Sequence, residues 1–548
     1  MTHPKHQPDR SQRSGTMKRH MKALTAIPLA GVLLLAACSS PGQEADNNDA
    51  DAASGGETND ADATSGGETN DADAASGGEI TVALGAAPQS FDPLASVSGG
   101  DYSYFYLVYD TLIEMDEDAN AAPGLAESWD IPDDTTIVLN LRSDIEFHDG
   151  TPFDAEAVKW NLERANSEGS NTRDLSSIES IDVVDEHTVQ LNLSQPDASI
   201  PLVLSDRPGT MISPAAFEEL GEDYHLNPVG TGAFEVVEHI SNESVRYEKN
   251  EDYWKDGVSL DAITITVMGD ENTVINAMRA GQVHVASAGP AALAAFAEDS
   301  DFTIEVSDQL VYTQLLLNTG IAPLDNPKVR EAISHAIDKA GINEALTGGL
   351  GKVAHQSFPE GYSAYNPNIS IEYDPELSRQ LLAESGVPAD QLKIDILFFG
   401  GVGTWPALAE ATAAQLRDVG FTVELVPLEV TAALAEWGQN GAHAALFTWS
   451  GRNDPLQTLS TLYGATGASN QGKTSPDGME EMLESARTTY DSAERAEIFK
   501  EISALAADYH YHVVYNFIPR TQVFASNIGG MESHFVKKPD YSTLFLKD

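Results

Sequence analysis

The sequence holds a single cysteine, Cys38, in 548 residues, so no disulfide can form within the chain. Basic residues are also scarce: 31 Lys and Arg stand against 85 Asp and Glu, which gives a formal net charge of −54. A surface this acidic repels phosphate backbones and anionic lipid headgroups. The composition therefore argues against nucleic acid as a partner and against docking of the protein surface on a membrane.

Motifs that carry catalysis are missing as well. The sequence has no Gly-x-Ser-x-Gly elbow, no His-Glu-x-x-His pair, no P-loop and no Gly-x-Gly-x-x-Gly that opens a helix. His510 and His512 are spaced to share one face of a strand, but the apolar Val513-Val514-Tyr515 that follows favours a core strand over a metal pair. We therefore predict a protein that is not an enzyme and that holds no cofactor and no metal.

Long apolar runs are limited to one, Ala23 to Ala37, which is shorter than the about 20 residues that a membrane-spanning helix needs. The positively charged stretch Met17 to Lys22 precedes it, as in a secretory signal. The run ends in Leu35-Ala36-Ala37-Cys38, which resembles a bacterial lipobox. We expect residues 1–38 to be a signal peptide, Cys38 to carry a lipid, and the protein to sit on the outer face of the cell membrane. Whether Met1 or Met17 starts the chain stays open.

The next segment, residues 39–79, has no aromatic residue, Leu, Ile, Val, Lys or Arg. An acidic unit of the type Asn-Asp-Ala-Asp-Ala-Ala-Ser-Gly-Gly-Glu-Thr runs three times through it, beginning at Asn48, Asn59 and Asn70. Such a segment buries too little apolar surface to offset the entropy of ordering. We interpret it as a disordered acidic linker.

The remaining residues, 80–548, alternate between strand-like and helix-like patterns, which predicts an α/β protein with parallel strand pairing. The pattern predicts a helix from Tyr102 to Leu112 and another from Asp154 to Ala165. A β-rich stretch at about 119–227 is expected to form a sub-domain. Gly150, Gly230 and Gly232 are expected in tight turns with positive φ.

The order of motifs in this body resembles the family of extracellular solute-binding proteins that serve peptide, nickel and opine importers of the ATP-binding-cassette (ABC) type. No single motif is specific, but their order behind a lipobox is. The motifs are Phe91-Asp92-Pro93, Tyr109 to Leu112, Pro123 to Trp129, Phe147 to Phe153, Asn227 to Phe234, Asn250 to Trp254, Val329 to Ile333, Ala336 to Asp338, Tyr373 to Pro375, Leu381 to Gly386 and Arg495 to Ile498.

This resemblance implies a two-lobed fold of the periplasmic-binding-protein kind (type II) with an extra sub-domain and a hinge between the lobes. We expect a first lobe at 80–311 with the sub-domain about 119–227 inserted, a second lobe at 312–519, and a C-terminal segment 520–548 that returns to the first lobe. It also implies partners: a peptide or small polar solute, and the permease and ATPase subunits of an ABC importer.

In peptide-binding relatives an acidic residue just before an Asp-Pro pairs with the amino terminus of the ligand. The matching stretch here is Phe447 to Pro455, and Arg452 stands about where the acidic residue would be. An arginine favours a carboxylate or phosphate instead. Two interpretations stay open: Arg452 contacts ligand, or it pairs with a neighbouring acid such as Asp454. Asp454 also fits the cap of the following helix.

The predicted function is capture of di- to oligopeptides between the lobes. The alternatives are a non-peptide anion, an opine or a nickel chelate in the same fold, and, from another class, a secreted hydrolase or a surface chaperone. The candidate ligand-binding residues are Trp449, Arg452, Asn453, Asp454, Tyr312, Tyr102, Tyr104, Phe358 and Arg207.

Overall fold

The computed structural model describes residues 77–96, 99–167, 174–401, 403–439, 441–530 and 540–547. The predicted signal peptide, Cys38 and nearly all of the predicted linker lie outside these residues. The linker prediction extends slightly too far, because Gly77 donates a backbone hydrogen bond to Ser259 and the first strand already begins at Glu79.

The first lobe is built on a seven-stranded sheet whose middle strand is the predicted β1 (Glu79–Leu84). β1 pairs in parallel with β10 and β11, and the other pairings are antiparallel, so the sheet is mixed rather than parallel throughout. Its strands are, in spatial order, β12 (Phe302–Ser307), β19 (Arg520–Ala525), β11 (Val285–Ser287), β1, β10 (Ala262–Val267), β9 (Ser244–Lys249) and β8 (Phe234–Ile240).

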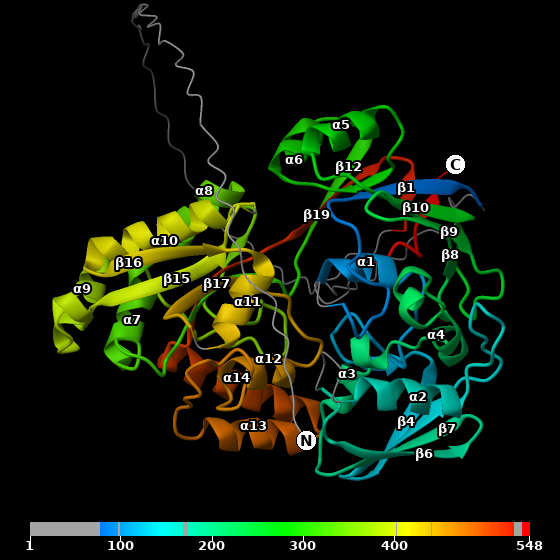
Figure 1. The fold of residues 1–548 in the computed structure, drawn as a ribbon, viewed down its shortest axis with the longest axis horizontal. Coiled ribbons are helices and arrows are strands. Elements are labelled where there is room, and N and C mark those ends of the chain that lie inside the picture. The colour runs from blue at the N-terminus through cyan, green and yellow to red at the C-terminus, as the bar shows by residue number, and fades with distance from the viewer. Residues whose placement is uncertain are drawn as a thin grey trace, which may run out of the picture. The chain divides into compact units, whose positions relative to one another are not determined.

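A four-stranded antiparallel sheet forms the sub-domain of the first lobe (Figure 1). Its strand order is β4 (Ala126–Asp133), β5 (Thr136–Leu141), β7 (Thr188–Leu193) and β6 (Ile178–Asp185). Helix α2 (Ala155–Ala165) lies on this sheet, and the Asp154 carboxylate caps it by accepting from Ala157 N. The smaller elements of the lobe are α1 (Tyr102–Phe105), α3 (Ile200–Val203), α4 (Pro214–Leu220), α5 (Glu271–Arg279), α6 (Pro290–Phe296), β2 (Ile113–Met115), β3 (Ala121–Pro123), β20 (Ile528–Gly529) and β21 (Phe545–Leu546).

The expected helix from Tyr102 to Leu112 is wrong beyond Phe105, where α1 ends. Tertiary hydrogen bonds replace the helical ones: Val108 O accepts from Gly232 N, and Leu107 O accepts from Phe234 N, each at 2.8 Å. The expected positive φ is found at Gly150 (76°) but not at Gly230 or Gly232. At these two glycines a Cβ would lie 2.2 Å and 2.4 Å from the Val108 backbone, so close approach is what favours glycine there.

The second lobe is built on a six-stranded sheet with helices on both faces. Its strands are, in spatial order, β14 (Lys352–Val353), β18 (His512–Phe517), β13 (Tyr312–Leu317), β17 (Ala444–Trp449), β15 (Lys393–Phe399) and β16 (Thr422–Leu428). Its helices are α7 (Pro327–Ala336), α8 (Lys339–Thr347), α9 (Pro375–Glu384), α10 (Trp405–Val419), α11 (Val430–Gly438), α12 (Pro455–Tyr463), α13 (Met479–Thr488) and α14 (Ser492–Tyr509).

Two crossovers join the lobes, as the predicted hinged fold requires. One runs from β12 to β13 and the other from β18 to β19, so the last strands return the chain to the first lobe (Figure 1). The crossovers bond to each other: Gln309 Nε2 donates to Ile518 O, and Ile518 N donates to Val311 O, both at 2.8 Å. Paired crossing segments of this kind form a hinge about which lobes rotate as units. No helix among the described residues is long and apolar enough to cross a bilayer.

Candidate functional site

The loop after β17 places the predicted residues of the second lobe against the first lobe. Asn453 is buried, and its side-chain nitrogen donates to the backbone oxygen of Ser205 at 3.1 Å and to the Ser205 hydroxyl at 2.9 Å. On the other side of the loop, Gly99 faces Ser450, since a Cβ at Gly99 would lie 3.6 Å from the Ser450 Cβ. The loop 449–454 therefore forms part of the contact between the lobes.

Arg452 is half-buried in this loop, with its guanidinium carbon 5.0 Å from the centroid of the Trp449 ring. Its Nη1 donates to Gly451 O at 2.7 Å and to the Ser450 hydroxyl at 3.3 Å. Within the described part of the chain, no carboxylate forms an ion pair with Arg452. The direct contacts of the guanidinium are thus neutral oxygens and an aromatic face, and none of them is an ion pair.

Asp454 does not pair with Arg452. It is fully buried, and its two carboxylate oxygens accept from Arg495 Nη1 at 2.5 Å and Nη2 at 3.1 Å. It also caps α12, because Leu456 N donates to its Oδ1 at 2.8 Å. The predicted helix cap is confirmed and the suggested Arg452–Asp454 pair is wrong. Both carboxylate oxygens of Asp454 are thus engaged within the second lobe, where they fix the start of α12 and the end of the loop.

The first lobe presents carboxylates to the same region. Burial raises the pKa of Asp174, and the charge of Arg452 and a hydrogen bond from Gln457 oppose that shift, which identifies Arg452 as the cation that acts on Asp174. Asp206 is buried beside Ser205 and accepts from the Tyr102 hydroxyl and from Arg207 N at 2.7 Å. Asp174 thus lies within electrostatic range of both Arg452 on the second lobe and Asp206 on the first.

Tyr102 and Arg207 come together in the first lobe, as two of the sequence candidates. Arg207 lies over the Tyr102 ring with its guanidinium carbon 4.6 Å from the centroid, and Tyr106 stacks on Tyr102 at 5.7 Å between centroids. Burial, together with the Asp206 charge, raises the pKa of Tyr102, so its phenol stays a neutral donor. Tyr104 points elsewhere: it is a core residue that donates to Ala86 O at 2.9 Å.

Tyr312 and Phe358 lie behind the loop in the core of the second lobe. The Tyr312 hydroxyl donates to Ser357 at 2.9 Å, and the Phe358 ring stacks on Tyr362 with 5.6 Å between centroids. The Tyr362 hydroxyl donates to Asn453 O at 2.8 Å. These aromatic residues form the part of the second-lobe core on which the loop packs. Trp449 belongs to the same core, and its indole nitrogen donates to the Thr458 hydroxyl at 3.1 Å.

His510 and His512 do not form a metal pair. His512 Nδ1 donates to Gln314 Oε1 at 2.6 Å, so its Nε2 accepts from the Tyr463 hydroxyl at 3.0 Å. His510 bonds the Ser334 hydroxyl at 3.0 Å. Across the residues that the structure describes, no group of three or more His, Cys, Asp or Glu side chains is arranged to hold a metal ion.

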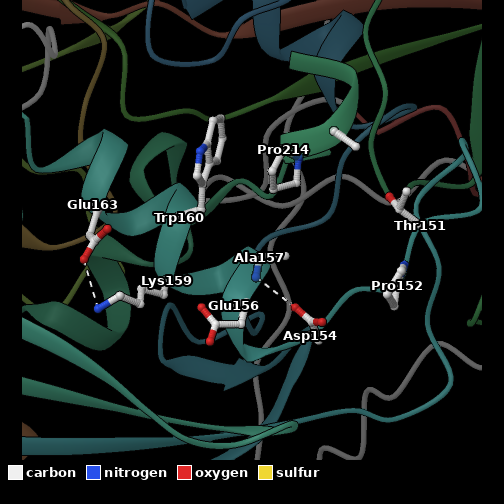
Figure 2. A pocket seen from close by; sticks show the side chains of 10 residues that line it. Thr151, Pro152, Asp154, Glu156, Ala157, Lys159, Trp160, Glu163 and Pro214 are labelled. Atoms are coloured by element: carbon white, nitrogen blue, oxygen red, sulfur yellow. Dashed lines mark hydrogen bonds and ion pairs between the residues drawn. The ribbon is translucent and has the colours of Figure 1, made fainter. Parts of the chain in front are cut away.

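The two cavities that stand out lie away from this loop. The larger, about 390 Å³, lies beside α2 and is lined by Asp154, Lys159, Trp160 and Pro214 among others (Figure 2). Its charged groups are already engaged, since Asp154 caps α2 and Lys159 pairs with Glu163 at 3.0 Å. The smaller, about 280 Å³, lies between α7 and the end of α14. Neither brings residues of the two lobes together, so we place the candidate site at the loop 449–454.

Comparison with known proteins identifies the family to which this two-lobed chain belongs. The model of the bacterial extracellular solute-binding proteins, family 5 (middle region), matches residues 120–470. The chain belongs to this family. Members are extracytoplasmic binding proteins that bind peptides or other small solutes and work with the permease and ATPase subunits of ABC importers. They are transport proteins rather than enzymes.

Three proteins illustrate the similarity. The glutathione-binding protein GsiB of Salmonella paratyphi A is 28% identical over 438 residues, which cover 77% of this chain and 85% of that protein. The di/tripeptide-binding protein 2 of Pseudomonas aeruginosa is 27% identical over 465 residues, covering 77% and 86%. The structure of the periplasmic binding protein DppA of Helicobacter pylori in complex with the peptide STSA aligns with a TM-score of 0.77 and 24% identity over 86% of this chain and 99% of that one. This last similarity confirms the fold alone.

Sequence reasoning missed the residues that meet the loop from outside it. Ser205, Asp174 and Asp206 lie more than 240 residues before Asn453 in the chain, and nothing in their local pattern indicates that they face it. Arg495 was noted only as part of a helical motif, and its bond to Asp454 had no signal in the sequence.

Proposed function

We propose that this protein binds short peptides between its lobes and delivers them to an ABC importer. The observation that carries the proposal is the meeting of opposite charges at the lobe contact: Arg452 of the second lobe acts on Asp174 of the first, and Asp206 acts on Asp174 from the same lobe. A peptide is a zwitterion with charges at opposite ends, so its carboxylate would pair with Arg452 and its ammonium group with the first-lobe carboxylates. The relatives named for glutathione and for di- and tripeptides support a ligand of two or three residues.

The experiment pairs ligand variants with a protein variant. Trialanine, its C-terminal amide and its N-acetyl form are titrated calorimetrically into the full chain carrying Cys38→Ser, and into the same chain with Arg452→Gln. A hydrogen-bonded charge pair contributes about 1.5–3 kcal/mol, so we expect Arg452→Gln to weaken trialanine binding about 10- to 100-fold. Amidation should weaken binding to the parent by a similar factor and leave the variant unaffected.

Arg379→Gln is the matched control, because Arg379 pairs with Asp418 on the exposed surface of α9 and α10 within one lobe. If amidation leaves the affinity of the parent for the peptide unchanged, Arg452 does not bind the C-terminal carboxylate of the peptide. If N-acetylation leaves that affinity unchanged, the first-lobe carboxylates do not bind its ammonium group.

The second candidate is a non-peptide anion such as an opine or a metal chelate, which the unpaired Arg452 charge also suits. Native mass spectrometry of the protein purified without added ligand separates the two. A mixture of di- and tripeptide masses supports peptide binding, and one non-peptide anion supports the alternative. Turnover of a bound peptide would support a hydrolase instead.

We further propose that Cys38 carries a lipid that holds the protein to the outer face of the cell membrane. The support is the positive segment, the short apolar run and the small residues before Cys38. Cells expressing the parent chain should release it into the detergent phase of a Triton X-114 extract, and Cys38→Ser should move it to the aqueous phase. Equal partitioning of both would contradict lipidation.

A further inference from the structure

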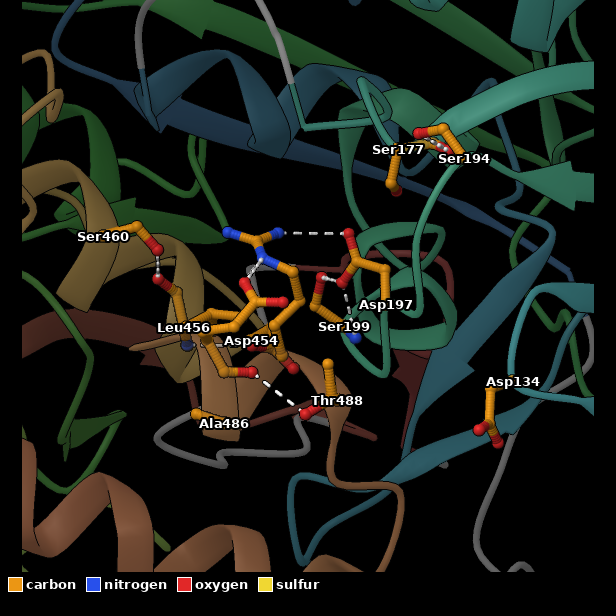
Figure 3. Close-up of polar contacts among 12 residues, drawn as sticks. Asp134, Ser177, Ser194, Asp197, Ser199, Asp454, Leu456, Ser460, Ala486 and Thr488 are labelled. Atoms are coloured by element: carbon orange, nitrogen blue, oxygen red, sulfur yellow. Dashed lines mark hydrogen bonds and ion pairs between the residues drawn. The ribbon is translucent and has the colours of Figure 1, made fainter. Parts of the chain in front are cut away.

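A second set of contacts joins the lobes, away from the loop 449–454. The loop 194–199, between β7 and α3 of the sub-domain, meets the end of α13 in the second lobe. Arg487 Nη1 pairs with Asp197 Oδ2 at 3.3 Å, and Ala198 N donates to Arg487 O at 2.8 Å. Figure 3 shows Asp197 and Ser199 beside Thr488, the last residue of α13.

Tyr490, between α13 and α14, adds a second point of attachment. Its hydroxyl accepts from Asp197 N at 3.3 Å and donates to Asp134 O at 3.0 Å, so it bonds both the loop 194–199 and the turn between β4 and β5. Burial raises the pKa of Tyr490, which keeps the phenol protonated and able to donate. The contact is thus made of one ion pair and three hydrogen bonds, all between lobes.

Hydrogen bonds within the first lobe orient the Asp197 carboxylate for this contact. Its side chain is buried, and its Oδ1 accepts from Ser199 N at 3.1 Å and from the Ser199 hydroxyl at 2.6 Å. These bonds lie within the first lobe and fix the carboxylate, so that Oδ2 is left to face Arg487. A carboxylate that is already oriented loses little entropy when its partner arrives.

One arginine connects this contact to the loop 449–454. Arg495 Nε donates to Ala486 O at 2.7 Å, and its other nitrogens hold Asp454. Ala486 precedes Arg487, and Asp454 follows Asn453, which bonds Ser205 of the first lobe. These two contacts between the lobes are therefore joined through a single buried side chain.

We propose that Asp197, Arg487 and Tyr490 form a latch that holds the lobes closed. The bonds exist only when the lobes are in contact, so they stabilise the closed state and not the open one. Because a ligand held between lobes needs the closed state, the latch raises apparent affinity by the factor by which it raises the closed population. The affinity part of this inference rests on the proposed function, and the closure part does not.

Closure is measured without ligand by electron–electron resonance between spin labels at Val184→Cys on β6 and Ser485→Cys on α13, in the full chain with Cys38→Ser. Both positions are exposed, and they lie on the two sides of the latch. The variants are Arg487→Met and Tyr490→Phe, and the control is Arg379→Met, which removes an ion pair inside the second lobe. Far-UV circular dichroism verifies that each variant is folded.

We expect each latch variant to move label pairs from the short to the long distance, with the ratio of open to closed changed about fivefold, as for one partly exposed ion pair or hydrogen bond. A distance distribution equal to that of Arg379→Met would overturn the latch. Trialanine affinity is the second readout and should fall by the same factor as the closed population. If trialanine binds neither parent nor variant, the proposed function fails while the distance measurement still decides the latch.

Discussion

The buried pair of Arg495 and Asp454 gives the sharpest stability prediction. Arg495 is 8% exposed and Asp454 is 0% exposed. Replacing Arg495 with Met keeps an unbranched apolar stem against Phe499, over which the guanidinium carbon now lies at 4.8 Å. The substitution removes two bonds to Asp454 and one to Ala486 O, and leaves a buried carboxylate whose one remaining partner is Leu456 N.

The size of the effect follows from these contacts. At about 1.5 kcal/mol for a hydrogen bond to a charged group, three lost bonds amount to about 4.5 kcal/mol. Removal of one partner of a buried ion pair costs about 3–5 kcal/mol, which agrees. We therefore expect Arg495→Met to lower the free energy of unfolding of the second lobe by about 4 kcal/mol.

Urea unfolding followed by far-UV circular dichroism measures this loss as a fall in the unfolding midpoint. Arg379→Met is the control, because its ion pair is 42% and 70% exposed and should contribute about 0–1 kcal/mol. Adding Asp454→Asn to Arg495→Met should restore part of the stability, since an amide is less costly to bury than a carboxylate and still caps α12. A loss no larger than that of the control, or no rescue by Asn, would refute this account of the pair.

Two further predictions concern the core. Burial lowers the pKa of His512 to about 3, below its unfolded value of about 6.5, so stability that is present above pH 6.5 is lost as the pH falls toward 3. His512→Gln should remove about 2 to 3 kcal/mol of the difference between the free energies of unfolding at pH 7 and pH 4.5; an unchanged difference would place the acid sensitivity elsewhere. Gly232→Ala should destabilise the first lobe by more than about 2 kcal/mol, because the added Cβ would lie 2.4 Å from Val108 C. The control is Gly438→Ala in α11, where an added Cβ would meet nothing within 4 Å. Thermal unfolding should show this control to be neutral or stabilising. Equal shifts of the melting temperature in the two glycine variants would contradict this reasoning.

Local signals in the sequence were enough for much of the fold. The predicted helix at Asp154–Ala165 is confirmed because Asp154 is its cap and its apolar residues recur at helical spacing on the sub-domain sheet. The predicted helix at Tyr102–Leu112 is mostly wrong because the backbone of Leu107 and Val108 bonds to a segment more than 120 residues later. Propensity describes a segment in isolation, and here a distant partner supplied better hydrogen bonds than the helix would have.

The glycines show the same limit in another form. A glycine in a turn has a local reason, positive φ, and Gly150 has it. Gly230 and Gly232 have a tertiary reason, the backbone of Val108, which no window of sequence around them contains. Both reasons favour glycine, so the residue type alone does not distinguish a positive φ, as at Gly150, from a close backbone approach, as at Gly230 and Gly232.

Charge is where the sequence was least informative and the structure adds most. In a chain with 85 acidic residues, the acids near any arginine in sequence are many, and Asp454 was a natural partner for Arg452. In the structure the partner of Asp454 is Arg495, which lies 41 residues later in the chain. Two guanidinium nitrogens of Arg495 bind the two carboxylate oxygens in a bidentate pair. That assignment has two consequences at once. It leaves Arg452 without a direct ion pair among the described residues, with Asp174 as the carboxylate that its charge reaches, and it ties the loop that carries Arg452 to α14 and to Ala486, beside Arg487. The pairing of Arg495 with Asp454 therefore underlies both proposals, the ligand-binding role of Arg452 and the latch at Arg487.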